Sequence, residues 1–223
     1  MKHTLFIITV VLSVLCLSGC ATMNFSANYY TPPAGYQTEV AILFSTLLKS
    51  LSLKNTYKLN IVTERESRGL KGIPAMSNKV VILPDNFIKY TFQNYYKDRH
   101  KVFTCVIVHE FIHEEFDLPS SPPEKHFETD ARTIALLGTK DKETAENYYK
   151  SLRVMQSYWF ARKGVAGHTF NVGWNVINAG AAVFGLPHAF VDWFATDLST
   201  RLKLIAKHYN INRRSVFRRS ESR

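Results

Sequence analysis

The stretch His109-Glu110-Phe111-Ile112-His113 organises the chain. In a helix, residues four positions apart lie on one face, so the imidazoles of His109 and His113 can each give one nitrogen to a single Zn²⁺. Glu110 then lies beside that face, where its carboxylate can hold and deprotonate a water molecule bound to the metal. An apolar segment precedes the pentad and predicts a helix from about residue 101 to 116 that runs through a core.

The pentad matches the H-E-x-x-H pattern of zinc peptidases, whose metal has a third protein ligand and keeps one position for water. Candidates for that ligand lie on the next expected helix, which begins at Glu124. Glu128 and Asp130 are two residues apart and point to different sides of a helix, so we expect only one of them to bind the metal. His126 is a further candidate, but we expect it to be a half-exposed residue at the start of the helix.

An E-x-x-A pattern begins at Glu128, and together with the pentad it resembles the gluzincin class of metallopeptidases, nearest to its CAAX-prenyl-endopeptidase and minigluzincin group. In that class a Glu on a second helix completes the metal shell, which implies Glu128 as the third ligand. Asp130 is then the alternative ligand, or it orients His109 or His113. The chain departs from the pattern at Arg132, where the class commonly has Asp or Asn.

The resemblance implies an α+β fold, a mostly helical zincin-like (minigluzincin) domain with a small sheet before the zinc helix. Hydrophobic periodicity predicts the other elements. They are helices over residues 37–53, 84–96, 124–137, 142–162 and 198–208, and strands over residues 57–61 and 79–83. Two apolar segments, 170–184 and 187–194, contain polar residues and are shorter than a membrane span, so we expect core helices; a lid or membrane-dipping hairpin is the alternative.

The first twenty residues carry a targeting pattern. An apolar run ends in Leu17-Ser18-Gly19-Cys20, which resembles the signal of bacterial lipoproteins. The resemblance implies lipidation of Cys20 and, because Ala21 rather than Asp follows, the periplasmic side of the outer membrane in a two-membrane bacterium. A plain signal peptide or an uncleaved anchor is the alternative. The expected parts are a signal peptide (1–19), a lipidated tether (20–35), a metallopeptidase domain (36–210) and a basic tail (211–223).

The composition is that of a globular protein, since 46% of the 223 residues are hydrophobic and 21% are charged. Lys and Arg (28) exceed Asp and Glu (18), which gives a net charge of +10. Part of this excess lies in the tail, and no nucleic-acid motif accompanies it, so we expect no nucleic-acid partner. Only Cys105 lies outside the leader region, which leaves no intramolecular disulfide to expect.

These features predict a membrane-anchored zinc metalloendopeptidase that holds one Zn²⁺ per chain and hydrolyses peptide bonds of envelope proteins. Glu110 is expected to activate the zinc-bound water, and His188 or Arg201 to stabilise the oxyanion. An extended protein or peptide substrate is expected to add as a strand along residues 80–83, taken as a sheet edge. The alternative is a catalytically silent zinc-binding lipoprotein that acts as a scaffold or envelope-assembly factor.

Overall fold

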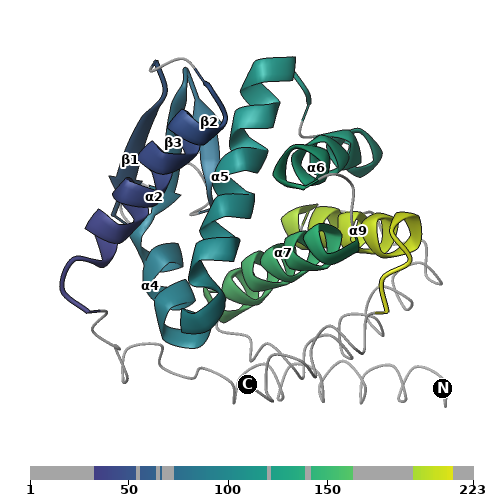
Figure 1. Cartoon of the computed structure of the whole chain (residues 1–223). Helices are drawn as coiled ribbons and strands as arrows, with labels where there is room; N and C mark the ends of the chain where they lie inside the picture. The colour runs from purple at the N-terminus through teal and green to yellow at the C-terminus, as the bar shows by residue number, and fades with distance from the viewer. Residues whose placement is uncertain are drawn as a thin grey trace, which may run out of the picture. The chain divides into compact units, whose positions relative to one another are not determined.

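The computed structural model in Figure 1 describes residues 33–53, 56–63, 66, 73–119, 122–138, 142–162 and 193–212. The chain divides into two units, and the larger one consists of Tyr30–Gln156 with Asp192–Arg223. The smaller unit contributes only residues 157–162 to the described part. Several predictions fall outside the described residues. They concern the expected signal peptide with Cys20, most of the expected tether, His188, nearly all of the apolar segments and most of the basic tail.

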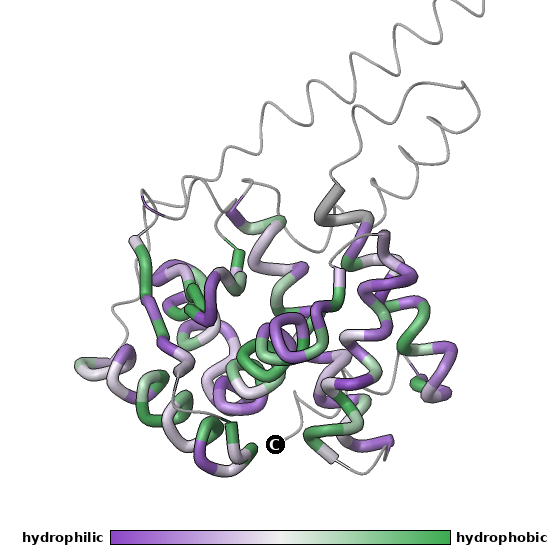
Figure 2. The backbone as a smooth tube through the Cα atoms, turned by 90° about the horizontal axis from the view of Figure 1, so that it is seen from above, coloured by the Kyte–Doolittle hydropathy of each residue, from purple (hydrophilic) through white to green (hydrophobic). Residues whose placement is uncertain are grey.

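The described chain is mostly helical with one small sheet, so the α+β prediction is confirmed. Its elements are α2 (Tyr36–Ser50), β1 (Lys58–Val62), β2 (Ala75–Ser77), β3 (Val80–Pro84), α4 (Asp85–Asn94), η2 (Tyr96–Asp98), α5 (Arg99–Phe116), α6 (Pro123–Leu137), α7 (Lys142–Arg162) and α9 (Trp193–His208). Figure 2 shows hydrophobic and hydrophilic residues alternating along these helices, as expected where one face of a helix is buried. No helix among the described residues has the length and hydropathy of a membrane span.

The three strands are ordered β1-β3-β2, with β1 parallel and β2 antiparallel to β3. The prediction that residues 80–83 form a sheet edge is therefore wrong, because β3 is the central strand. Strand β2 has only three residues, too few to show an alternating pattern in the sequence. A two-residue turn joins it to β3, and Asn78 (φ 49°) and Lys79 (φ 63°) both have the positive φ of a type I′ hairpin.

Helix α5 packs against the sheet and against helix α2. It contacts α2, β2 and β3, and every residue from Cys105 to Ile112 is buried. The Phe111 ring lies 5.7 Å from that of Phe44 on α2 and 5.0 Å from that of Tyr57 before β1. This packing explains the apolar lead-in to the pentad and leaves the helix little freedom to rotate.

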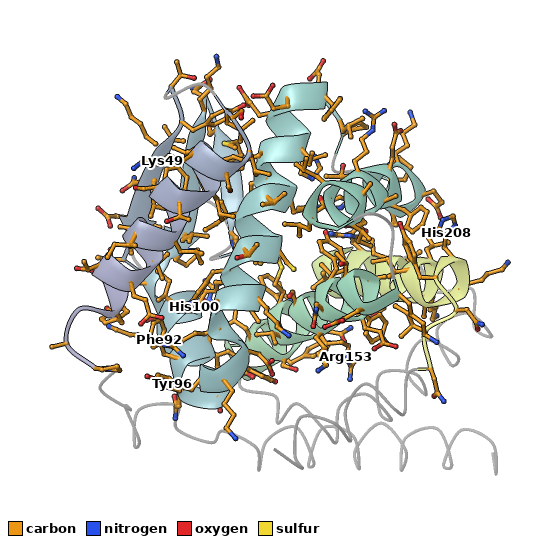
Figure 3. All side chains as sticks on the ribbon, viewed as in Figure 1. Lys49, Phe92, Tyr96, His100, Arg153 and His208 are labelled. Atoms are coloured by element: carbon orange, nitrogen blue, oxygen red, sulfur yellow. The ribbon has the colours of Figure 1, made fainter. Side chains whose placement is uncertain are left out.

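The N-terminal end of α5 is anchored by Arg99, the first residue of the helix. Its guanidinium lies 3.9 Å from the centre of the Tyr96 ring and 5.4 Å from that of Phe92, and its Nε donates to Glu39 on α2 (2.6 Å). Figure 3 shows Phe92, Tyr96 and His100 gathered at this end of the helix. Contacts at the first residue of α5 and along its length therefore fix the rotation of the helix about its axis.

On the other side of α5 lie three helices. Helix α6 contacts both α5 and α9, and Figure 1 shows α6 and α9 side by side. Within the larger unit, Tyr148 on α7 bonds residues of α5 and α6, and Gln156 near its end donates to Ser199 on α9 (2.9 Å). The pentad therefore faces residues from three further helices.

Candidate metal centre

Three histidines meet with their Nε2 atoms almost equidistant. His109 and His113 come from successive turns of α5, and His126 comes from the first turn of α6. The Nε2 atom of His126 lies 2.9 Å from that of His109 and 3.0 Å from that of His113, and the third separation is 3.1 Å. Nitrogens bound tetrahedrally to one Zn²⁺ at about 2.0–2.1 Å are about 3.3 Å apart. The cluster is close to the size of a zinc coordination triangle.

The Nδ1 atoms of His113 and His109 face hydrogen-bond acceptors. His113 Nδ1 lies 2.8 Å from the carbonyl oxygen of Leu118, which can only accept, so this nitrogen carries the proton. His109 Nδ1 lies 2.7 Å from the Tyr148 hydroxyl, which donates its single proton to Asp130 Oδ1 at 2.7 Å. His109 Nδ1 must therefore donate to the Tyr148 oxygen. In both rings the Nε2 atom is left with a lone pair.

His126 completes the same pattern. Its Nδ1 atom lies 3.2 and 3.4 Å from the two carboxylate oxygens of Asp197 on α9, an acceptor that fixes the proton on Nδ1. The three Nε2 atoms then lie about 3 Å from one another, with their lone pairs directed at a common point. The lone pairs repel one another unless a cation lies between them.

The protonation of the three rings agrees with metal binding. Burial lowers the pKa of all three imidazoles, well below the usual value for His109 and to about 4 for His113. The nearby Arg201 guanidinium lowers these pKa values further. All three histidines are therefore neutral at physiological pH, the form in which imidazole binds metals.

A buried ion pair lies against the cluster. Arg201 on α9 donates to both oxygens of Asp130 on α6 (2.5 and 2.9 Å) and to Asp197 (3.3 Å), and all three residues are 0–1% exposed. Burial opposes the charge of Arg201, but its interactions with Asp130, Tyr148 and Asp197 together outweigh burial and raise the Arg201 pKa above its usual range. Two carboxylates and one guanidinium leave a net negative charge here, which a divalent cation would balance.

Two residues singled out from the sequence thus lie at the centre. Arg201 was expected as an oxyanion donor; its Nη2 atom is 3.4 Å from His109 Nε2, and its N–H groups are directed at the two carboxylates. Asp130 lies 3.4 Å from His109 Nδ1, where it can orient that ring. The structure brings both to His109 from different helices.

The E-x-x-A pattern implied that Glu128 joins His109 and His113, but the structure does not bring it there; it brings His126 there instead. The Glu128 side chain is 53% exposed and pairs with Arg132 one turn later, at 2.7 Å. The physical reason is the helical phase of α6: His126 and Asp130 are four residues apart and share the buried face, whereas Glu128 lies between them on the other side. His126 is only 7% exposed because Asp197 of α9 lies against the first turn of α6.

Glu110 faces a cavity of about 330 Å³ that also contacts the three histidines. It is 8% exposed and forms no hydrogen bond or ion pair with the described residues. Burial raises the Glu110 pKa to about 7, although Arg201 acts in the opposite direction. A carboxyl group with this pKa can both take up and release a proton near neutral pH.

Sequence reasoning missed Tyr148 and Asp197. Tyr148 lies 39 residues after His109, and Asp197 lies 71 residues after His126. Neither belongs to a local motif, because each reaches its histidine only when its helix packs against another. The spacing of His126 and Asp130 by one helical turn was the sequence signal that places both on one face of α6.

Comparison of the chain with models of known protein families, with curated proteins and with solved structures finds no match. The geometry by itself defines the class of the site. Three buried histidines lie close enough to hold one metal ion, and they are compatible with a zinc site.

Proposed function

We propose that the protein is a zinc-dependent metallopeptidase with a zincin-like arrangement of its helices. The observation that carries the proposal is the position of Glu110, a buried carboxylate without a protein partner among the described residues, in the cavity where three histidine lone pairs converge. A scaffold needs the metal but has no use for such a group. The lipidation expected at Cys20 would place the activity at the cell envelope, with envelope proteins as substrates.

In the proposed reaction, His109, His113 and His126 hold the metal, and Zn²⁺ supplies Lewis acidity and lowers the pKa of water. Glu110 takes a proton from the attacking water and passes it to the leaving amine. Burial raises its pKa to about 7 in the metal-free protein, and a bound cation would lower this pKa and favour the carboxylate that takes the proton. Tyr148, Asp130 and Asp197 keep the rings in the tautomer that presents Nε2.

The substrate backbone would lie along β2. Ala75 and Met76 of this strand line the cavity, and no described strand pairs with its outer edge. An extended peptide can add to such an edge by backbone hydrogen bonds, whatever its sequence. The substrate-binding edge expected at 80–83 is thereby moved to residues 75–77.

Replacing Glu110 by Gln tests the proposal. The zinc-loaded wild type should cleave fluorescently labelled casein, and Glu110→Gln should lower the rate roughly 10²–10⁴-fold, the contribution typical of a general base, with zinc content unchanged. Glu128→Gln is the matched control, since Glu128 is an exposed glutamate that does not line the cavity. It should retain most of the activity.

Two results would contradict this function. Equal rates for wild type and Glu110→Gln would show that the carboxylate takes no part in the chemistry. A zinc-loaded wild type that cleaves neither casein nor a mixture of peptides from envelope proteins would favour the alternative, a zinc-binding scaffold or envelope-assembly factor.

A further inference from the structure

The lining of the cavity has a polar and an apolar part. The polar part includes the three histidines and Glu110. The apolar part, called the apolar wall below, comes from the segment before β2, from β2 itself, from the chain after α5 and from α7. Its members are Ile73, Pro74, Met76, Leu118 and Met155.

Met155 has a particular place in the apolar wall. A second, much smaller cavity of about 10 Å³ lies next to the first, and Cys105, Val106 and Leu152 contribute to its lining. Among the described residues, His109, Glu110 and Met155 line both cavities, and Met155 is the apolar one of the three. It is 7% exposed, and its unbranched, flexible side chain fills this position without a polar partner.

Glu110 and Glu114 line the cavity without a cationic partner among the described residues, whereas the charge of Asp197 is balanced by Arg201 and by the proposed metal. An acidic side chain of a substrate that lies near Glu114 is disfavoured by its like charge. Arg201 is the one cationic side chain that the described residues contribute to the lining. It donates to Asp130 and Asp197, and its Nη2 atom also lies 3.4 Å from His109 Nε2, so its charge is already shared with two buried carboxylates.

We infer that this cavity selects peptides with a large apolar side chain beside the group that faces the three histidines, and that Met155 sets the depth of the pocket for that side chain. The inference rests on the proposed function and names its substrate class. A volume of about 330 Å³ is at the lower end for ligand sites, enough for one large side chain with its flanking backbone. The apolar side chains of the lining residues favour a substrate side chain of the same kind.

Binding of hydroxamates to the zinc-loaded protein, measured by calorimetry, tests the inference without requiring turnover. Acetohydroxamate reports on the metal alone, and peptide hydroxamates carrying Leu, Phe, Asp or Lys report on the pocket. The Leu compound should bind roughly 10–100-fold more tightly than acetohydroxamate or the Asp compound, as expected for filling an apolar pocket.

Met155→Ala should join the two cavities and shift the preference toward Phe over Leu by about 10-fold. Val154→Ala is the matched control, because Val154 is equally buried on α7 but lines neither cavity. Its Phe-to-Leu ratio should equal that of the wild type. Met76→Ala, on the β2 side of the wall, should weaken Leu binding and serves if Met155→Ala does not fold.

Equal affinities for the Leu, Phe, Asp and Lys compounds would overturn the inference. Tightest binding of the Lys compound would also overturn it, because the selectivity would then come from the charge of Glu114. A shift of the same size in Val154→Ala would remove the role of Met155. Selective binding without any peptide hydrolysis would instead contradict the proposed function and leave the apolar pocket standing. Failure of acetohydroxamate to bind a chain shown to contain zinc would contradict both.

Discussion

Replacing His126 by Ala should remove most of the zinc affinity, although this residue lies outside the H-E-x-x-H pentad. Its Nε2 atom is 2.9 Å and 3.0 Å from those of His109 and His113, so it is one of three donors around a common point. Zinc sites with four protein ligands bind with about 10–16 kcal/mol, or roughly 2.5–4 kcal/mol per ligand. Losing one ligand should therefore weaken binding about 10²–10³-fold.

The matched control is Glu128→Ala, two residues away on the same helix. The Glu128 and Arg132 side chains are 53% and 41% exposed, and a surface pair of this kind contributes about 1 kcal/mol or less. This variant should bind zinc as the wild type does.

Competition with a chromophoric zinc chelator at neutral pH measures the two affinities directly. Thermal unfolding gives a second readout, because a ligand at 100 times its Kd stabilises the folded state by about 2.7 kcal/mol. Zinc at a concentration that stabilises the wild type and Glu128→Ala by this amount should have little effect on His126→Ala. Loss of zinc by Glu128→Ala, with His126→Ala unaffected, would refute the assignment and restore the gluzincin-like ligand set.

Two further predictions concern groups around the metal centre. Tyr148→Phe removes the hydroxyl between His109 Nδ1 and Asp130, so zinc affinity should fall roughly 10–100-fold in the same chelator assay; an unchanged affinity would show that Asp130 alone orients His109. Glu110→Gln should change how the stability of the metal-free protein depends on pH. The folded-state pKa of Glu110 is about 7 against 4.5 in the reference state, so wild-type unfolding free energy should lose up to about 3 kcal/mol relative to Gln as pH rises through this window. Urea unfolding at both ends of the window measures the difference, and parallel pH profiles of the two proteins would contradict the buried position of the carboxylate.

The sequence by itself determined the local part of this protein. Two histidines four residues apart with an adjacent Glu, after an apolar run, define a buried helix with both imidazoles on one face, because helical geometry needs no distant partner. The same local rules predicted α6 and α7 within one or two residues, and the helical character of the domain.

Only the tertiary structure decided which residues complete the centre. The apolar residues of α6 do not predict burial of the face that carries His126 and Asp130. That face is buried because α5 and α9 pack against it and supply polar partners for both side chains. The edge position of β2 likewise results from the pairing of its three residues with β3, which no pattern in the sequence predicts. Which residue joins His109 and His113 follows from the rotation of α6 against α5 and α9, and the packing energy that fixes this rotation comes from residues far apart in the chain.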